Sequence, residues 1–225
     1  MSTHRFPMKT MIRSLALIAC AIGLSSCSSI LGKEEPMEIL KPQVQVATDP
    51  SWPQVGWALA VTRPTANDML DSPRLAVSPT PGRIEVYKGV AWDDTTPEVV
   101  QQEAISAFED SGKILAVGRQ SNGLHTEFAL QMDLRDYQAV YRTPAGPPEV
   151  TLTVSARLVD FAGSRVVATR VFHQTAAASS TEVHAVARAY DTALSALLHD
   201  VVGWTLTSGE EAKAADRQRA RNRNP

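Results

Sequence analysis

The sequence is poor in cysteine and close to neutral in charge, and each shortage excludes a class of protein. Two cysteines among 225 residues can form at most one disulfide and cannot build a four-cysteine zinc site. A formal net charge of -2 supplies no overall positive field to attract nucleic acid. At 44% hydrophobic and 20% charged residues, the composition is that of a folded protein, and the length suits one domain with appendages.

The amino terminus has the organisation of a secretory signal. Four basic side chains, from His4 to Arg13, precede an apolar run from Leu15 to Leu24. About ten apolar residues are too few to span a bilayer but suit the apolar core of a signal peptide. The run ends in Leu24-Ser25-Ser26-Cys27, and small residues before a cysteine resemble the bacterial lipobox. We therefore predict cleavage after Ser26 and lipidation of Cys27.

Two alternatives stay open: an ordinary secretory signal with an incidental cysteine, and a weaker lipobox ending at Cys20. In the lipoprotein interpretation residues 1–26 are removed, and Cys27 carries an N-acyl chain such as palmitate and an S-diacylglycerol. No cysteine is then left for thiol catalysis or metal binding, and several acyl chains hold a protein firmly on a membrane. Inner-membrane lipoproteins commonly have Asp where this chain has Ser28, which favours the periplasmic face of the outer membrane.

The processed chain divides into three parts by composition. Residues 27–54 carry prolines and charges without a sustained period, which predicts an extended tether. A folded domain is predicted over 55–205, followed by a polar, disordered tail over 206–225. Apolar runs predict strands at 56–61, 74–77, 84–87, 114–117, 124–141, 150–158 and 166–172. The predicted fold class is α/β (α+β), a mixed, mainly antiparallel sheet of six or seven strands with two amphipathic helices packed on one face.

Local signals place the helices and one irregularity. The first helix is predicted from Thr96, as its N-cap, to Gly112, which suits a left-handed C-terminal residue. The second is predicted to begin near Ser179 and to end at Gly203. In the long strand, apolar residues occupy even positions up to Leu134 and odd positions afterwards. A slip of one residue predicts a β-bulge at Arg135-Asp136.

The sequence lacks the motifs of the common enzyme classes, including nucleophile elbows, zinc-protease helices, nucleotide loops and calcium loops. Asp93 and Asp94 could bind a cation, but a loop and capping role before the first helix is favoured. The basic residues after Ser208 could contact anionic lipid headgroups or could simply keep the C terminus soluble. We predict no catalysis, no metal, no cofactor beyond the acyl groups at Cys27, and no nucleic-acid binding.

Several segments together resemble the ABC-type transport auxiliary lipoprotein family. Two of them are Met69–Val77 (MLDSPRLAV) and Ile84–Trp92 (IEVYKGVAW). The segments Phe108–Gly112, Asp133–Ala139 and Ala189–Leu194 fit in the same order and spacing. This family includes the lipoprotein of the paraquat-inducible (Pqi) intermembrane lipid transport system. Glu127-Phe128 departs from the Asp-Tyr that often opens the long strand in the family.

The resemblance implies a non-catalytic accessory component of an ABC-type lipid transport system. The implied partners are an inner-membrane ABC permease and ATPase and an MCE (mammalian cell entry) domain protein that forms a periplasmic conduit. The lipoprotein would dock the conduit at the outer membrane and would form a homo-oligomer, as the Pqi member forms a ring.

The interaction surface and one rival function are also predicted. Tyr87, Trp92 and the polar face of the long strand are candidates for the interaction surface, with core packing as the alternative for both aromatic residues. The rival function is a periplasmic carrier that binds a lipid or a small ligand itself. A carrier would need an apolar cavity between the sheet and the helices.

Overall fold

A computed structural model describes residues 36–120, 125–143, 146–161 and 164–223. Nine strands and two helices lie in these ranges. The strands are β1 (Glu38–Leu40), β2 (Ala58–Val61), β3 (Thr65–Ala66), β4 (Arg74–Thr80), β5 (Arg83–Trp92), β6 (Ala116–Arg119), β7 (Phe128–Val140), β8 (Glu149–Asp160) and β9 (Arg165–Ala177). The helices are α2 (Thr96–Ser111) and α3 (Val183–Arg223). Ser26 and Cys27 lie outside the described residues.

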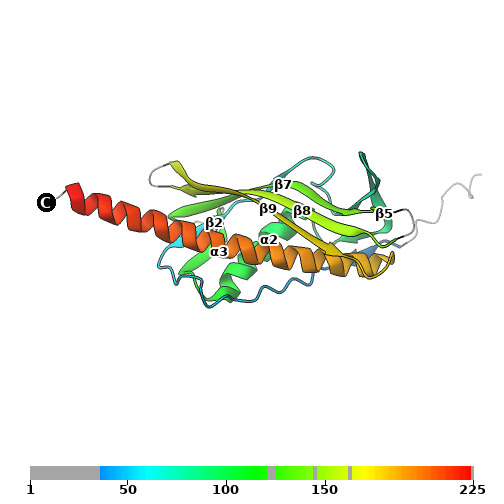
Figure 1. Ribbon diagram of the computed structural model, residues 1–225, viewed down its shortest axis with the longest axis horizontal. Coiled ribbons are helices and arrows are strands. Elements are labelled where there is room, and N and C mark those ends of the chain that lie inside the picture. The colour runs from blue at the N-terminus through cyan, green and yellow to red at the C-terminus, as the bar shows by residue number, and fades with distance from the viewer. Residues whose placement is uncertain (1–35, 121–124, 144–145, 162–163, 224–225) are drawn as a thin grey trace, which may run out of the picture. The chain divides into compact units, whose positions relative to one another are not determined.

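The strands form one mixed sheet in the order β1-β5-β4-β7-β2-β6, with β8 and β9 continuing from β7. The antiparallel pairings β7–β8 and β8–β9 are the long ones, with twelve residue pairs each. The antiparallel pairing β4–β5 is irregular, and the parallel pairings involve two to four residues each. Both helices cover the same face of the sheet (Figure 1). The predicted fold class is confirmed, and β1 and β3 are additions too short for sequence periodicity to reveal.

The predicted β-bulge is present in β7. The register with β8 shifts between Leu134 and Asp136, so that Arg135 is the extra residue. Leu134 and Tyr137 are both buried on the helix side of the sheet. The bulge therefore lets both halves of one long strand direct apolar side chains into the same core.

Helix α2 ends as predicted, because Gly112 adopts φ 59° and its N–H bonds to the carbonyl of Glu109. Its N-terminus differs by one residue. The N-cap is Thr95, which makes no capping side-chain bond to the helix. Thr96, the predicted cap, is buried, and its hydroxyl donates to the carbonyl of Ser72 at 3.3 Å.

The packed domain begins well before residue 55, in contrast to the predicted tether boundary. The backbone N–H of Gln43 donates to Asp191 Oδ1 at 3.0 Å, and that of Gln45 donates to Ser195 Oγ at 3.1 Å. Trp52 is buried against α3. An extended segment that bonds to helix side chains has no period of its own, which is why the sequence did not reveal it.

Helix α3 also continues past Gly203 to Arg223, where a disordered tail was predicted. At Gly203 the indole of Trp52 lies against the helix, so this glycine makes room for a ring and does not end the helix. Beyond it, Arg165 of β9 forms an ion pair with Asp216 at 2.9 Å. Figure 1 shows the last turns of α3 extending past the strands.

Candidate functional site

The sheet face opposite the helices is open and polar. Because side chains alternate along a strand, the residues between the buried ones on β7, β8 and β9 point to this face. Hydroxyl and amide groups dominate it, and the set is Gln131, Asp133, Gln138, Thr151, Thr153, Ser155, Arg157, Thr169, Val171, His173 and Thr175. Cross-strand bonds order part of the face, since Thr153 Oγ1 lies 3.0 Å from His173 Nδ1.

A hollow of about 360 Å³ lies on this face. It is lined by Thr62, Arg63, Thr65, Gln131, Met132, Asp133, Ser155 and Arg157. Several of these groups are already bonded, since Thr65 donates to Asp133 Oδ1 at 2.9 Å. Ser155 is only 6% exposed, and neither its hydroxyl nor the Arg157 guanidinium has a hydrogen-bond partner among the described residues. These two side chains are therefore free to bind an external polar group.

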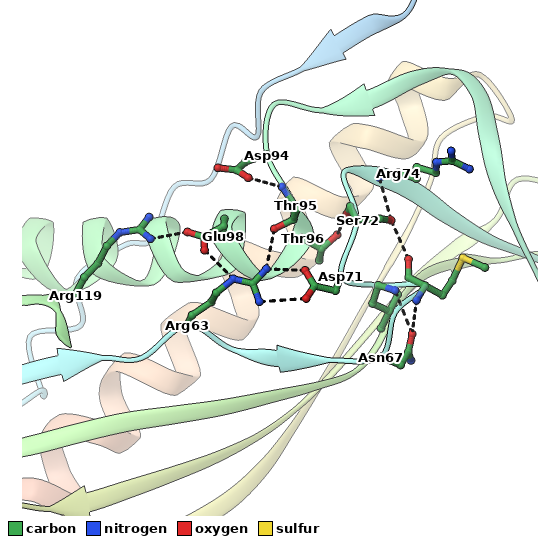
Figure 2. Close-up of polar contacts among 12 residues, drawn as sticks. Arg63, Asn67, Asp71, Ser72, Arg74, Asp94, Thr95, Thr96, Glu98 and Arg119 are labelled. Atoms are coloured by element: carbon green, nitrogen blue, oxygen red, sulfur yellow. Dashed lines mark hydrogen bonds and ion pairs between the residues drawn. The ribbon is translucent and has the colours of Figure 1, made fainter. Parts of the chain in front are cut away.

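The guanidinium of Arg63 joins a polar network at the N-terminus of α2 (Figure 2). It donates to Asp71 at 2.6 Å, to Glu98 at 2.7 Å and to Thr95 Oγ1 at 3.2 Å. Arg119 donates to the other oxygen of Glu98. Two arginines thus face two carboxylates, and the network ties β2, α2 and β6 together.

The network lowers the pKa of both of its carboxyl groups. The hydrogen bond from Arg119 holds the pKa of Glu98 below its ordinary value, with a further contribution from Arg63 and an opposing effect of burial. The bond from Arg63 likewise lowers the pKa of Asp71. Both carboxylates are charged at neutral pH, and the two arginines are already paired with them.

The loop between β3 and β4 is held by its own side chains. Asn67 Oδ1 accepts the N–H groups of Met69 and Leu70, each at 3.1 Å. The hydroxyl of Ser72 donates to the carbonyl of Met69 at 2.9 Å, and the carbonyl of Ser72 accepts the N–H of Thr96 at 3.1 Å. The segment that carries part of the family resemblance is therefore a brace for the first turn of α2.

Trp92 is only 2% exposed, and its ring packs edge-on against Tyr190 at 5.5 Å. It occupies the core, which was the alternative to its predicted place on an interaction surface. Tyr87 is half-buried, and its hydroxyl lies 3.3 Å from that of Tyr141. Burial, with a smaller contribution from Tyr141, raises the pKa of Tyr87 above its ordinary value.

The hollow combines one surface predicted from the sequence with residues that sequence reasoning did not select. The polar face of the long strand supplies Gln131 and Asp133. Ser155 and Arg157 lie on the outward-facing positions of the neighbouring strand, and Arg63 follows β2. Alternation in 150–158 indicates which side chains face outward, but only the sheet order brings these strands together.

Two further properties of the described residues bear on function. They contain no group of three or more His, Cys, Asp or Glu side chains arranged to hold a metal ion. None of the helices in the described part is both long and apolar enough to traverse a bilayer.

Residues 39–202 match the family model of the ABC-type transport auxiliary lipoprotein component. The crystal structure of protein XCC0632 from Xanthomonas campestris, described under the family name DUF330, is similar at 38% identity and a TM-score of 0.74. The match covers 78% of this chain and 99% of that one. A second solved structure, of an uncharacterized protein, shares the fold at a TM-score of 0.59 and 9% identity, over 75% of this chain and 97% of the other.

A protein of Bradyrhizobium diazoefficiens, bll6063, is 30% identical over 149 residues, which are 66% of this chain and 39% of that protein. The chain thus spans about two fifths of the length of this curated relative.

Proposed function

The chain belongs to the ABC-type transport auxiliary lipoprotein family, and on that premise we propose that it docks the periplasmic part of an ABC-type lipid transport system at the outer membrane. The family is a transport-auxiliary family and not an enzyme family. The family is described as a lipoprotein component, and lipoproteins are anchored in a membrane by their acyl chains. Three points go beyond family membership: the membrane that holds the anchor, the partner, and the surface that contacts the partner.

The anchor in this proposal is Cys27, exposed by cleavage after Ser26 and acylated. Since the packed unit begins at Met37, the tether would comprise residues 27–36 and not 27–54. Ten residues span at most about 35 Å when extended. The domain would therefore stay close to the outer membrane, within reach of a conduit that approaches from the inner membrane.

The proposed partner is the MCE-domain protein, which links the lipoprotein to the ABC permease and ATPase. The contact surface would be the open sheet face around the hollow. The observation that carries this assignment is the pair Ser155 and Arg157, a hydroxyl and a guanidinium in one polar hollow, neither of which is bonded to another described residue. Arginine is enriched among the residues that dominate binding energy at protein interfaces. Self-association into a homo-oligomer belongs to the same proposal.

A carrier function gains no support from the two hollows of the described residues that lie around Arg63. The hollow on the open face is lined by polar and charged side chains, and a second beside Arg119 has the same character. A lipid-binding cavity is lined predominantly by apolar side chains.

Charge reversal at Arg157 tests the docking surface. Arg157→Glu should weaken capture of the purified MCE-domain protein by about tenfold or more, as expected for loss of a central arginine. Arg74→Glu is the matched control, because Arg74 is also exposed and forms no ion pair with a described residue, yet lies away from the hollow. Circular dichroism should show that both variants are folded. If Arg157→Glu binds as tightly as the parent, the open face is not the docking surface.

A further inference from the structure

The hollow on the open sheet face contains hydrogen-bond donors that the described part of the chain leaves unused. Ser155 lines the hollow at 6% exposure, and its hydroxyl has no partner among the described residues. Arg157, two residues further along β8, is exposed and is not bonded to them either, and the same holds for the amide of Gln131 opposite it. Two residues span about 7 Å of strand, which an arginine side chain can cover. The hydroxyl and the guanidinium can therefore converge on one group in the hollow.

The other charged groups of this hollow are already engaged. Asp133, which lies opposite Ser155, accepts from the hydroxyl of Thr65 at 2.9 Å and pairs with Arg135 at 3.5 Å. The guanidinium of Arg63 is bound in the network at the N-terminus of α2. What remains free is a set of donors, one of which carries a positive charge. Such a set suits an anionic acceptor.

The neighbouring hollow beside Arg119 does not offer the same capacity. Its two arginines, Arg63 and Arg119, both donate to Glu98, as Figure 2 shows, and Arg119 also donates to Gln101. An anion in that hollow would compete with the Glu98 carboxylate for the same donors. The unbonded donors therefore distinguish the hollow at Arg157.

We propose that this hollow binds one carboxylate of the protein partner, from an Asp or Glu side chain, held by the guanidinium of Arg157 and the hydroxyl of Ser155. Arginine presents a planar fork of N–H groups that matches a carboxylate, and hydrogen bonds to ionised groups are the strong ones. The proposal deepens the docking function and rests on it, because it names the chemistry of the group that the open face receives.

Two features of the lining favour a protein carboxylate over a phosphate. The carboxylate of Asp133 repels a second negative charge, so a group with a single charge fits better than a phosphate monoester, which carries about −1.5 to −2. Among the described residues that line the hollow, Met132 is the one apolar side chain, and it is buried. The acyl chains of a phospholipid would therefore meet no apolar wall.

Capture of the purified MCE-domain protein tests the charge of the bound group, with a chain that begins at residue 27 and carries Cys27→Ser. Arg157→Gln and Ser155→Ala should each weaken capture by about tenfold, because each removes a bond to an ionised group. Asp133→Asn should strengthen capture by about two- to fivefold, because it removes a like charge and keeps an acceptor for Thr65. Arg74→Gln, away from the hollow, is the matched control and should change nothing.

The signs of these effects decide between classes of bound group. A cationic group on the partner would make Arg157→Gln strengthen capture and Asp133→Asn weaken it, and that result would overturn the proposal. Capture that Arg157→Glu weakens but Arg157→Gln and Ser155→Ala leave unchanged refutes the carboxylate alone, since repulsion and bulk at the open face then suffice. Capture that all of these variants leave unchanged refutes the docking surface itself.

A charge swap tests the carboxylate from the partner's side. Arg157→Glu is assayed against variants of the MCE-domain protein in which each exposed Asp or Glu is replaced in turn by Arg. We expect one of them to recover about tenfold in capture, because the two charges are then exchanged. A complete set without any recovery would overturn the proposal.

Vesicles distinguish a lipid phosphate from a protein carboxylate. The same chain, which lacks acyl groups, should sediment equally with vesicles of phosphatidylglycerol and of phosphatidylcholine, whether or not it carries Arg157→Gln. Binding to phosphatidylglycerol vesicles that Arg157→Gln abolishes would assign the hollow to a lipid phosphate and would overturn the proposal.

Discussion

Replacement of Gly209 by alanine should destabilise the protein, although alanine is the better helix former. Gly209 lies inside α3, where Gly→Ala usually gains about 1 kcal/mol. Here a Cβ atom would meet the indole of Trp57, with Cη2 at 2.9 Å and Cε2 at 3.1 Å and Cζ2 closer still. The glycine therefore makes room for a tryptophan.

The indole of Trp57 has little freedom to move away. It is 2% exposed and packs edge-on against Phe128, with ring centroids 4.9 Å apart. Overpacking of a tight core costs about 1–3 kcal/mol, and an overlap with an indole that is itself held by Phe128 belongs near the upper end. After the helix gain of about 1 kcal/mol is subtracted, Gly209→Ala should lose about 2 kcal/mol of unfolding free energy. For a domain of this size that lowers Tm by about 4–8 °C.

Denaturant and thermal unfolding of the chain with Cys27→Ser measure this loss. Thr207→Ala is the matched control, because Thr207 is exposed two residues away and its replacement should raise stability by a few tenths of a kcal/mol. Trp57→Phe removes the ring atoms that clash, so the double variant Trp57→Phe, Gly209→Ala should lose less than the sum of the two single variants. A Gly209→Ala protein as stable as the parent would show that the Trp57 indole can move aside at no cost.

Two further predictions concern the α2 network and the bulge. The pKa of Glu98 is lowered in the folded state. Its contribution to stability is therefore complete at a pH above about 4.5, the ordinary pKa of this group, and is lost as the pH falls through the folded pKa. Glu98→Gln should therefore lower Tm at pH 7 and reduce the loss of stability on acidification; identical pH profiles of parent and variant would contradict this. Deletion of Arg135 should be tolerated with a modest fall in Tm, because it removes the extra residue and leaves the alternation on both sides intact. Deletion of Asp133 shifts the side chains that follow it to the wrong face of the sheet and should prevent folding. Circular dichroism measures folding in both deletion variants. If the two deletions destabilise the protein equally, the register is wrong.

Those parts of the fold that have a periodic pattern could be predicted from the sequence. The phase change between Leu134 and Tyr137 indicated the bulge, and Gly112 indicated the end of α2. Segments whose position depends on distant partners could not be predicted. The backbone N–H groups of Gln43 and Gln45 bond to side chains of α3, and Gly203 makes room for the indole of Trp52, which lies far away in the sequence. From the sequence alone, the first segment therefore resembled a tether, and Gly203 resembled the end of a helix.

The candidate site shows the same division. Alternation along β7 and β8 predicts which side chains face outward, including Gln131. The hollow itself depends on the parallel pairing of β2 and β7, which brings Thr62 and Arg63 beside β7, on whose other side lie Ser155 and Arg157 of β8. A parallel contact of three residues leaves no pattern in the sequence. The sequence left open whether Trp92 packs in the core or lies on the surface. Its packing against Tyr190 shows that it lies in the core.

Site-specific photo-cross-linking in cells tests the docking claim most directly. A photoreactive residue at Gln131, on the open face beside the hollow, is compared with one at Gln102, exposed on α2. Both are placed in the full, lipidated chain. If the open face is the docking surface, the residue at Gln131 captures the MCE-domain protein and the residue at Gln102 does not. Capture from Gln102 alone, or from neither position when the transport proteins are present, would contradict it.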